Sequence, residues 1–252
     1  MLERLLFLLL AALLPTRPAI ADDCTFSAAV GLDKPPYVIE ATRSGLEIET
    51  FAAAAQAAGC LVRFQHVPPT RALQMIRNRE VDAMLTIRED SGVAGHYSEP
   101  YVTYRNVALS LEKNALPLQS VADLGRFRVA AFQNARIALG PTFRRVVEGN
   151  PEYREIASQQ SQVNMLFTGR IDVVVGDIRI LARLREAMPE GIDRNQPLQV
   201  HALFPPTEYR SLFTDPALRD RFNEGLRTIR ANKTLQRLIE RYTSEPLRLG
   251  RR

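Results

Sequence analysis

Side chains that could bind a small molecule follow three predicted strands of the N-terminal half, at the point where each strand ends. They offer an aromatic ring, a hydroxyl group and two guanidinium groups. In open α/β sheets, ligands bind beyond the carboxyl ends of the strands. Such a set suits a small anionic or zwitterionic ligand, although in an Arg-rich chain either guanidinium could simply be a solvated loop cation. The residues are Tyr37, Arg71, Thr86 and Arg88.

Two further polar side chains follow predicted strands of the C-terminal half. Asp177 comes after an apolar strand at residues 171–175, where a carboxylate either caps the next helix or meets a cationic group of the ligand. Gln133 follows a strand at residues 128–132 and could contact a ligand across a cleft. The pattern leaves both interpretations of Asp177 open.

Short motifs of enzymes and metal sites are missing from the sequence. It contains no nucleophile elbow, phosphate loop, dinucleotide fingerprint or zinc motif. His66, His96 and His201 lie far apart and have no paired ligand spacing. We therefore expect no catalytic residue, no metal ion and no cofactor. The net charge is +5, but the cations are scattered singly among acids, so we also expect no nucleic-acid partner.

The N-terminus predicts export. One Arg within residues 1–4 precedes an unbroken apolar run at residues 5–14, and Ala19-Ile20-Ala21 gives the small-x-small pattern cut by signal peptidase. The run is shorter than the ~20 residues needed to span a bilayer. We expect a signal peptide at residues 1–21, cleavage after Ala21, and a soluble periplasmic protein. The alternative is an N-terminal membrane anchor.

The mature chain contains two cysteines, Cys24 and Cys60, and each precedes a predicted strand. If those strands are parallel neighbours, both cysteines lie at the same end of the sheet, where a short bridge is possible. Export to an oxidising compartment favours one disulfide. The alternative is two separate buried thiols.

Strands and helices alternate along the chain. Strands at residues 25–32, 61–67 and 81–87 are separated by helices, which is typical of a parallel sheet. A further strand is predicted at residues 102–111, and a second strand–helix unit follows it. Ser44-Gly45-Leu46-Glu47 predicts a capping box at the start of the first helix.

Five segments, in their order and spacing, resemble the family 3 extracellular solute-binding proteins of bacterial transporters, a family best known for binding amino acids. The likeness covers nearly all of the mature chain. The segments are residues 34–37 (KPPY), 45–49 (GLEIE), 79–83 (REVDA), 97–101 (YSEPY) and 169–177 (GRIDVVVGD).

This resemblance implies an α/β fold with the two lobes of a type II periplasmic binding protein, a two-segment hinge and a ligand cleft between the lobes. We expect the first lobe to contain residues 22–111. Residues 112–198 would form the second lobe. Residues 199–252 would then return through the hinge and add their terminal helices to the first lobe.

The resemblance also implies roles for single residues. Tyr37 would stack on the ligand, Thr86 would bond its carboxylate and Asp177 would meet its amine. One position departs from the pattern, because Ser91 stands where amino-acid binders carry a carboxylate-binding Arg. Either Arg88 or Arg71 replaces that residue, or the ligand is not a standard α-amino acid.

The sequence therefore predicts a monomeric, non-enzymatic solute-binding protein. It would capture a small polar or anionic ligand, an amino acid or organic acid, and deliver it to an inner-membrane permease of an ABC importer. The first alternative is a periplasmic enzyme on the same fold, similar to cyclohexadienyl dehydratases. The second is an accessory binding protein without a transport role.

Overall fold

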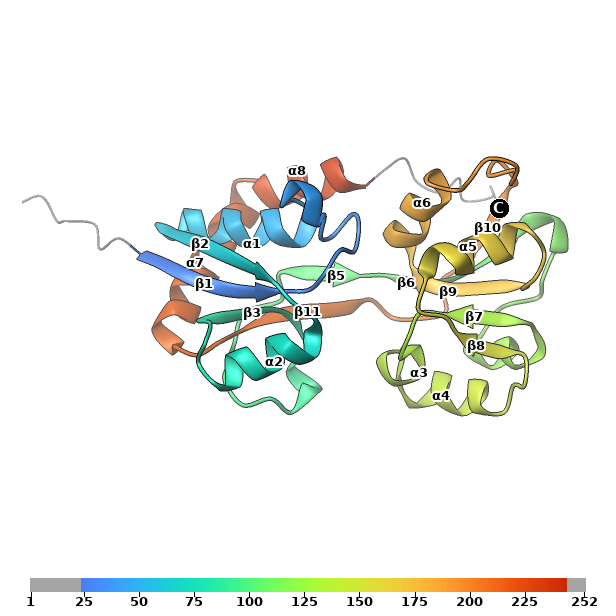
Figure 1. Cartoon of the computed structure of the whole chain (residues 1–252), viewed down its shortest axis with the longest axis horizontal. Coiled ribbons are helices and arrows are strands. Elements are labelled where there is room, and N and C mark those ends of the chain that lie inside the picture. Colours follow the sequence, from blue (N-terminus) through green and yellow to red (C-terminus); the bar gives the residue numbers. More distant parts are fainter. Residues whose placement is uncertain (1–23, 244–252) are drawn as a thin grey trace, which may run out of the picture.

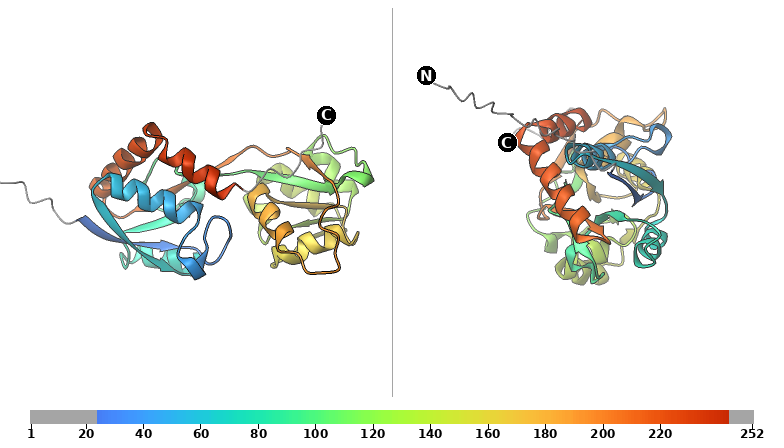
Figure 2. Two further views of the ribbon diagram at one scale, coloured as in Figure 1. Left: turned by 90° about the horizontal axis from the view of Figure 1, so that it is seen from above. Right: turned by 90° about the vertical axis from the view of Figure 1, so that its left-hand side faces the viewer.

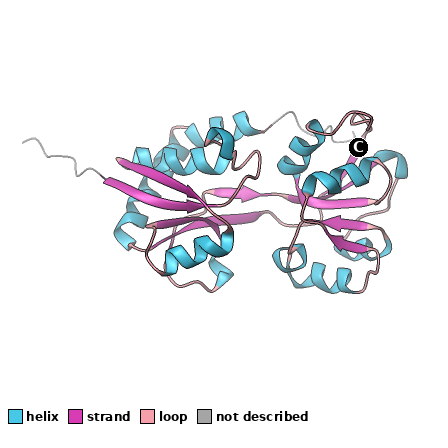
Figure 3. Cartoon of the chain, viewed as in Figure 1, coloured by secondary structure: helices cyan, strands magenta, loops and turns pink. Residues whose placement is uncertain are grey.

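Apolar strands and amphipathic helices assemble into two separate sheets, each with helices on both faces. The computed structural model describes residues 24–243 and arranges them as two lobes side by side, connected by extended segments (Figure 1). Figure 3 shows that a sheet lies at the centre of each lobe. This confirms the predicted two-lobe α/β fold. The predicted signal peptide and its cleavage site lie outside the described residues.

The first lobe, lobe I, is built on a sheet of order β2-β1-β3-β11-β4, with β5 also pairing with β11. Helices α1, α7 and α8 cover one face of this sheet and α2 covers the other. Its elements are β1 (Cys24–Val30), α1 (Leu46–Ala57), β2 (Cys60–His66), α2 (Pro69–Arg77), β3 (Ala83–Ile87), β4 (His96–Tyr97), β5 (Val102–Tyr104), β11 (Thr207–Phe213), α7 (Pro216–Ala231) and α8 (Thr234–Tyr242).

Aromatic packing fixes the helices of lobe I on their sheet. The fully buried Phe51 of α1 lies with its ring centroid 4.5 Å from that of Phe222 on α7 and 6.0 Å from that of Phe213 on β11. At Gly225 a Cβ atom would lie 1.9 Å from the carbonyl oxygen of Ala54, so only glycine lets α7 approach α1 this closely. The terminal helices therefore return to lobe I, as the resemblance implied.

The predicted disulfide is confirmed. Strands β1 and β2 are parallel neighbours, and Cys24 lies directly opposite Cys60 in their register. The two residues form a disulfide with a Cα–Cα distance of 4.5 Å.

The second lobe, lobe II, has a sheet of order β10-β6-β9-β7-β8. Helices α5 and α6 pack on one face, and α3 and α4 on the other. Its elements are β6 (Asn106–Leu111), β7 (Val129–Ala131), α3 (Ala135–Ala138), α4 (Gly140–Glu148), β8 (Tyr153–Glu155), α5 (Gln159–Phe167), β9 (Val173–Asp177), α6 (Ile178–Glu186) and β10 (Leu198–His201).

Two chain segments cross between the lobes, and the first one corrects the predicted boundary. The single strand expected at residues 102–111 is divided at Arg105: β5 pairs with β11 in lobe I, whereas β6 pairs with β9 and β10 in lobe II. Lobe II therefore begins at Asn106 rather than at residue 112. The second crossing lies between β10 and β11, and Figure 2 shows both crossings between the lobes from above.

Among residues 24–243, no helix is long and apolar enough to cross a membrane.

Candidate functional site

The end of β3 holds a strained threonine. Thr86 has φ +57°, a left-handed conformation that is a genuine outlier for a β-branched residue. Its hydroxyl donates to Glu47 Oε2 at 2.5 Å and lies 2.9 Å from the Tyr101 hydroxyl. Such strain persists only where surrounding contacts hold it, and it concentrates at binding sites.

Glu47 is the centre of a buried polar cluster in lobe I. Its carboxylate is 1% exposed and accepts hydrogen bonds from Thr86 and Tyr104, while the Lys34 ammonium lies 3.1 Å away. Burial, and then the nearby Glu47 charge, raise the pKa values of Tyr101 and Tyr104 well above the usual range, so both phenols stay protonated donors. A buried carboxylate needs such partners, because an unpaired one is strongly unfavourable.

This use of Glu47 corrects the predicted capping box. Gly45 rather than Ser44 is the N-cap of α1, no side chain caps the helix, and Glu47 points into the lobe. Gly45 has φ +123°, and a Cβ there would lie 2.3 Å from the carbonyl oxygen of Tyr37. Glycine therefore allows the loop that carries Tyr37 to lie against the start of α1.

Tyr37 links the two lobes. The residue is fully buried, its ring stacks on Tyr104 with centroids 4.0 Å apart, and its hydroxyl donates to Asp177 Oδ2 at 3.0 Å. Arg179 of α6 donates to the same hydroxyl at 3.2 Å. One face of the ring is thus covered by Tyr104, and the ligand-binding role of Tyr37 stays a prediction.

Asp177 caps α6. Its Oδ1 accepts from the backbone N–H groups of Arg179 and Ile180 at 2.9 and 3.2 Å, and its Oδ2 accepts from the N–H of Arg105 at 2.8 Å. Burial raises the pKa of Asp177, and these hydrogen bonds oppose that rise. The capping interpretation is therefore confirmed, whereas contact with a ligand amine stays a prediction.

Arg88 reaches from lobe I to lobe II. Its guanidinium forms a two-pronged pair with Asp90, and its Nη1 donates to the carbonyl oxygen of Ala138 at 3.1 Å. It lines a cavity of about 260 Å³ that is otherwise formed by residues 138–140 of lobe II and residues 204–208, where the chain returns to lobe I. Of the two guanidiniums proposed for an anion, this one lies between the lobes.

Arg71 and Gln133 lie apart from that cavity. The Arg71 guanidinium binds Oε2 of Glu80, a residue that follows the C-terminal end of α2, at 2.6 Å. Neither Arg71 nor Gln133 lines the cavity at Arg88. Gln133 is exposed in the loop after β7. Of the six predicted site residues, Arg88 alone lines the 260 Å³ cavity, and Tyr37 and Asp177 contact each other between the lobes. Thr86 lies two residues before Arg88 in the sequence and contacts the Glu47 cluster.

Three residues of this region were not predicted as site residues from the sequence. Glu47 has the wrong local signal, since its spacing from Ser44 imitates a capping box. Arg179 is the second residue of α6, and an Arg at that position gives no sequence signal of a binding site. Glu155 ends a three-residue strand that has no sequence pattern, yet its carboxylate accepts from the N–H groups of Asn134 and Arg136 at 2.8 and 2.9 Å.

A match to a protein-family model identifies the family of this chain. The model of the bacterial extracellular solute-binding proteins, family 3, matches residues 27–245. The chain belongs to this family. No curated protein sequence matches the chain significantly. Within residues 24–243, no group of three or more His, Cys, Asp or Glu side chains is placed to hold a metal ion.

Solved structures share the fold of this family 3 protein at low sequence identity. The ligand-binding core of GluR0 in complex with L-glutamate is 15% identical, with 88% of this chain and 100% of that chain covered and a TM-score of 0.70. An ancestral arginine-binding protein bound to arginine is 17% identical, with coverage of 87% and 98% and a TM-score of 0.66. The ancestral amino-acid-binding protein AncCDT-1, a precursor of cyclohexadienyl dehydratase, is 20% identical, with coverage of 87% and 95% and a TM-score of 0.64.

Proposed function

We propose that this protein is a periplasmic solute-binding protein that captures a small anionic ligand between its lobes and delivers it to an ABC importer. Membership of an extracellular family and the N-terminal export pattern support the location. The ligand class is an organic acid or an amino-acid-like molecule. The inner-membrane permease is the expected partner, and the protein would act as a monomer.

The observation that carries this proposal is Arg88 in the cavity between the lobes. Its planar guanidinium already holds one carboxylate, that of Asp90, and it touches lobe II through the Ala138 carbonyl oxygen. Asp90 is an exposed side chain, so a ligand carboxylate can replace it on the Arg88 fork without leaving a buried charge unpaired. A ligand held there would contact both lobes.

The size of the cavity limits the ligand. Drug-sized ligands occupy pockets of roughly 300–1,000 Å³, and the cavity at Arg88 measures about 260 Å³. A molecule of the size of an amino acid or a small dicarboxylic acid fits that volume better than a peptide or an oligosaccharide.

Two carboxylates that an enzyme on this fold could use, Glu47 and Glu49, are committed to the scaffold, which favours binding over catalysis. Glu47 is held by Thr86, Tyr104 and Lys34. Glu49 is held by Arg241 and Tyr242 of α8. A general acid must deliver its proton to the substrate, and these acids instead accept hydrogen bonds from the protein.

A thermal-shift screen of the mature chain tests the proposal. Amino acids, amines and organic acids are added singly, and a ligand at 100 times its dissociation constant should stabilise the fold by about 2.7 kcal/mol. We expect hits among acids and none among simple amines. A screen in which only amines stabilise the protein would contradict the anionic ligand class.

The same ligand then separates the three functional alternatives. A strain lacking the gene should lose uptake of the ligand, and mass spectrometry should recover the ligand unchanged after incubation with the protein. Conversion of the ligand would instead identify an enzyme. Normal uptake in the deletion strain would identify an accessory binding protein.

A further inference from the structure

A second cavity, of about 440 Å³, lies in lobe I, where α2 ends and β4 begins. Its volume is within the range of small-molecule sites. Phe213, the last residue of β11, lines this cavity and lies opposite Ala83, the first residue of β3. Arg88 follows the other end of β3, so the two cavities lie at opposite ends of this strand, and they share no lining residue.

The floor of this cavity is apolar and fixed by packing. Ile76 of α2, Val93 and Phe213 line the cavity and are buried. Ile76 and Val93 belong to one hydrophobic cluster, together with Leu212 of β11. This packing holds the loop at residues 92–95 against the end of α2, beside the side chains that follow that helix.

The polar part of the lining is cationic. Arg77, Arg79 and His96 line the cavity, and none of its lining residues is acidic. Both arginines are exposed, so their guanidinium groups are accessible to a ligand. Among residues 24–243, neither guanidinium forms an ion pair or a hydrogen bond with the protein. Two unpaired guanidiniums at one cavity form a site for an anion.

The acids that follow α2 in the sequence do not neutralise this charge. Glu80 Oε2 accepts from the Arg71 guanidinium at 2.6 Å. Asp82 Oδ2 accepts from the N–H and the hydroxyl of Ser27 at 2.7 and 2.8 Å. Both carboxylates are therefore bound to other parts of lobe I.

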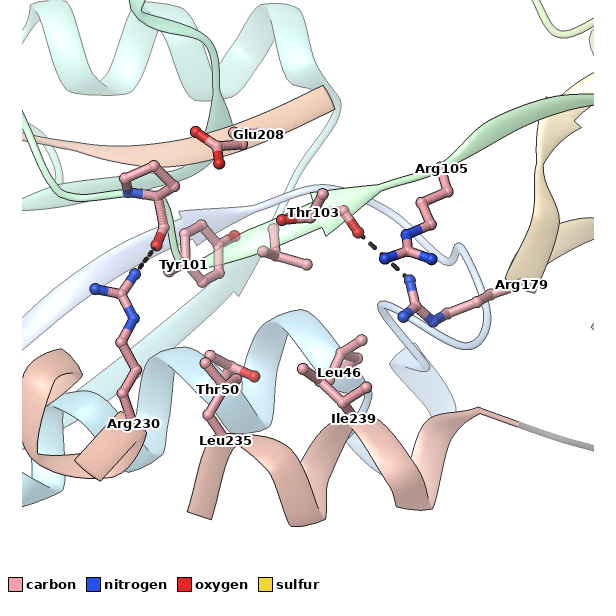
Figure 4. A pocket seen from close by; sticks show the side chains of 12 residues that line it. Leu46, Thr50, Tyr101, Thr103, Arg105, Arg179, Glu208, Arg230, Leu235 and Ile239 are labelled. Carbon is pink, nitrogen blue, oxygen red and sulfur yellow. Dashed lines mark hydrogen bonds between the residues drawn. The ribbon is translucent and has the colours of Figure 1, made fainter. Parts of the chain in front are cut away.

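A cavity of about 540 Å³ beside the crossing segments provides a contrast (Figure 4). Two guanidiniums of its lining are held by the protein. As drawn in Figure 4, Arg179 donates to the carbonyl oxygen of Thr103 and Arg230 to that of Pro100. The guanidiniums at the end of α2 have no such acceptor among the described residues.

The loop at residues 92–95 adds further donors. Within the described chain, the N–H groups of Ala94 and Gly95 have no acceptor. Gly95 has φ +151°, and a Cβ there would lie 2.7 Å from Cδ1 of Leu212, so glycine lets the loop lie against the sheet. The imidazole of His96, at the start of β4, can also donate from a ring nitrogen. Donors therefore come from the end of α2, from the loop and from β4.

We propose that this cavity binds a phosphate monoester. Its phosphate group has three free oxygens, which can accept from Arg77, from Arg79 and from the loop at residues 92–95 at the same time. A carboxylate, by contrast, is matched by a single guanidinium fork. The rest of the cavity holds the organic part of the ligand against the apolar floor. This site is separate from the ligand at Arg88 and does not depend on the function proposed for it.

Calorimetry on the mature chain, in phosphate-free buffer at low salt, tests the ligand class. The probes are glycerol 3-phosphate, inorganic phosphate, dimethyl phosphate and acetate. Charge-assisted contacts to two guanidiniums correspond to a dissociation constant of about 1 mM for glycerol 3-phosphate. Inorganic phosphate should bind more weakly, because it makes no contact with the floor. Dimethyl phosphate, with fewer free oxygens, should bind at least about tenfold more weakly, and acetate should not bind.

Amide NMR with the same probe locates the site, because glycerol 3-phosphate is an anion and could also enter the cavity at Arg88. We expect glycerol 3-phosphate to shift the amide resonances of Ala94 and Gly95. The amide of Gly140, which lines the cavity at Arg88, should stay unchanged.

Variants test the two guanidiniums. Arg77→Gln and Arg79→Gln should each weaken glycerol 3-phosphate about tenfold or more, because each removes a charge-assisted hydrogen bond. Arg63→Gln is the matched control. Arg63 is an exposed Arg of β2 in the same lobe and does not line the cavity, so this variant should bind as the wild type does.

Several results overturn the assignment. They are no binding of glycerol 3-phosphate, tighter binding of inorganic phosphate or acetate, or wild-type affinity in both Arg77→Gln and Arg79→Gln. Amide shifts at Gly140 that leave Ala94 and Gly95 unchanged would place the anion in the cavity at Arg88 and also overturn it. Failure of the ligand proposed at Arg88 leaves these expectations as they are, since the two tests use different probes and variants.

Discussion

His201 is a buried histidine whose two ring nitrogens are both bound inside lobe II. Nδ1 lies 3.1 Å from the carbonyl oxygen of Leu118, which can only accept, so Nδ1 carries the proton. Nε2 then accepts from the Ser110 hydroxyl at 3.0 Å. Burial lowers the pKa of His201 from its ordinary value of 6.5. The folded protein therefore holds this imidazole neutral.

This neutral histidine predicts a pH dependence of stability. Below about pH 6.5 the unfolded chain takes up a proton at His201 before the folded protein does, so the free energy of unfolding falls as the pH falls toward the lowered pKa. Chemical denaturation at pH 7.5, 6.5 and 5.5 should show this loss, and His201→Gln should reduce it. Identical pH slopes for His201→Gln and the wild type would contradict the assignment.

The role of a single residue was predictable where a local sequence signal determines it. It was missed where contacts between residues far apart in the sequence determine it. Asp177 caps a helix because it stands just before one, a local signal present in the sequence. Arg71 and Arg88 have equivalent sequence positions after strands, and only the structure shows that one binds Glu80 and the other faces lobe II. Glu47 could not be assigned because its partners Thr86 and Tyr104 lie 39 and 57 residues away.

At the scale of elements, the disulfide ties β1 to β2 across a separation of 36 residues. In the chain-entropy model, closing a loop of this length stabilises the folded state by about 3–4 kcal/mol. The double variant Cys24→Ser/Cys60→Ser should lose about that much in urea denaturation. The unfolded, unreduced wild type should contain no free thiol, and titration of two thiols would contradict the bridge.

Element order followed from the sequence, but the division between lobes did not. Most strands of the two sheets contain apolar runs bounded by turn residues, so the sequence predicts them from local signals. Residues 102–111 read as one strand, because the change of partner at Arg105 depends on β11 pairing with β5 and on β9 pairing with β6. Strands β4, β8 and β11 were missed. The first two have only two and three residues, and the third alternates polar and apolar side chains only in part.

At the scale of the whole molecule, few direct hydrogen bonds link the lobes away from the crossing segments. Tyr37 binds Asp177 and Arg179, Arg179 also donates to Thr243 after α8, and Arg88 binds Ala138. Since residues 106–201 form a sheet and helices of their own, we expect lobe II to move as one body about the crossing segments.

This arrangement predicts the effect of loosening the contact. Tyr37→Phe removes the hydroxyl that Asp177 and Arg179 share, so the ligand-free protein should open and its radius of gyration in small-angle scattering should rise. A saturating ligand should reduce that radius. Tyr153→Phe, which removes a hydroxyl bound to Glu155 within lobe II, is the control and should leave the radius unchanged. Equal radii for Tyr37→Phe and the wild type would count against a lobe contact at Tyr37.

The central claim is that Arg88, between the lobes, binds the acidic group of the ligand, and calorimetric titration of a ligand found in the thermal-shift screen tests it most directly. Arg71→Ala is the matched control, because that guanidinium is paired with Glu80 and does not line the cavity. A charge-assisted hydrogen bond contributes about 1.5–3 kcal/mol, so Arg88→Ala should raise the dissociation constant about ten- to a hundredfold. Arg71→Ala should change it by less than about twofold. Unchanged affinity in Arg88→Ala, or the large loss in Arg71→Ala instead, would contradict the account.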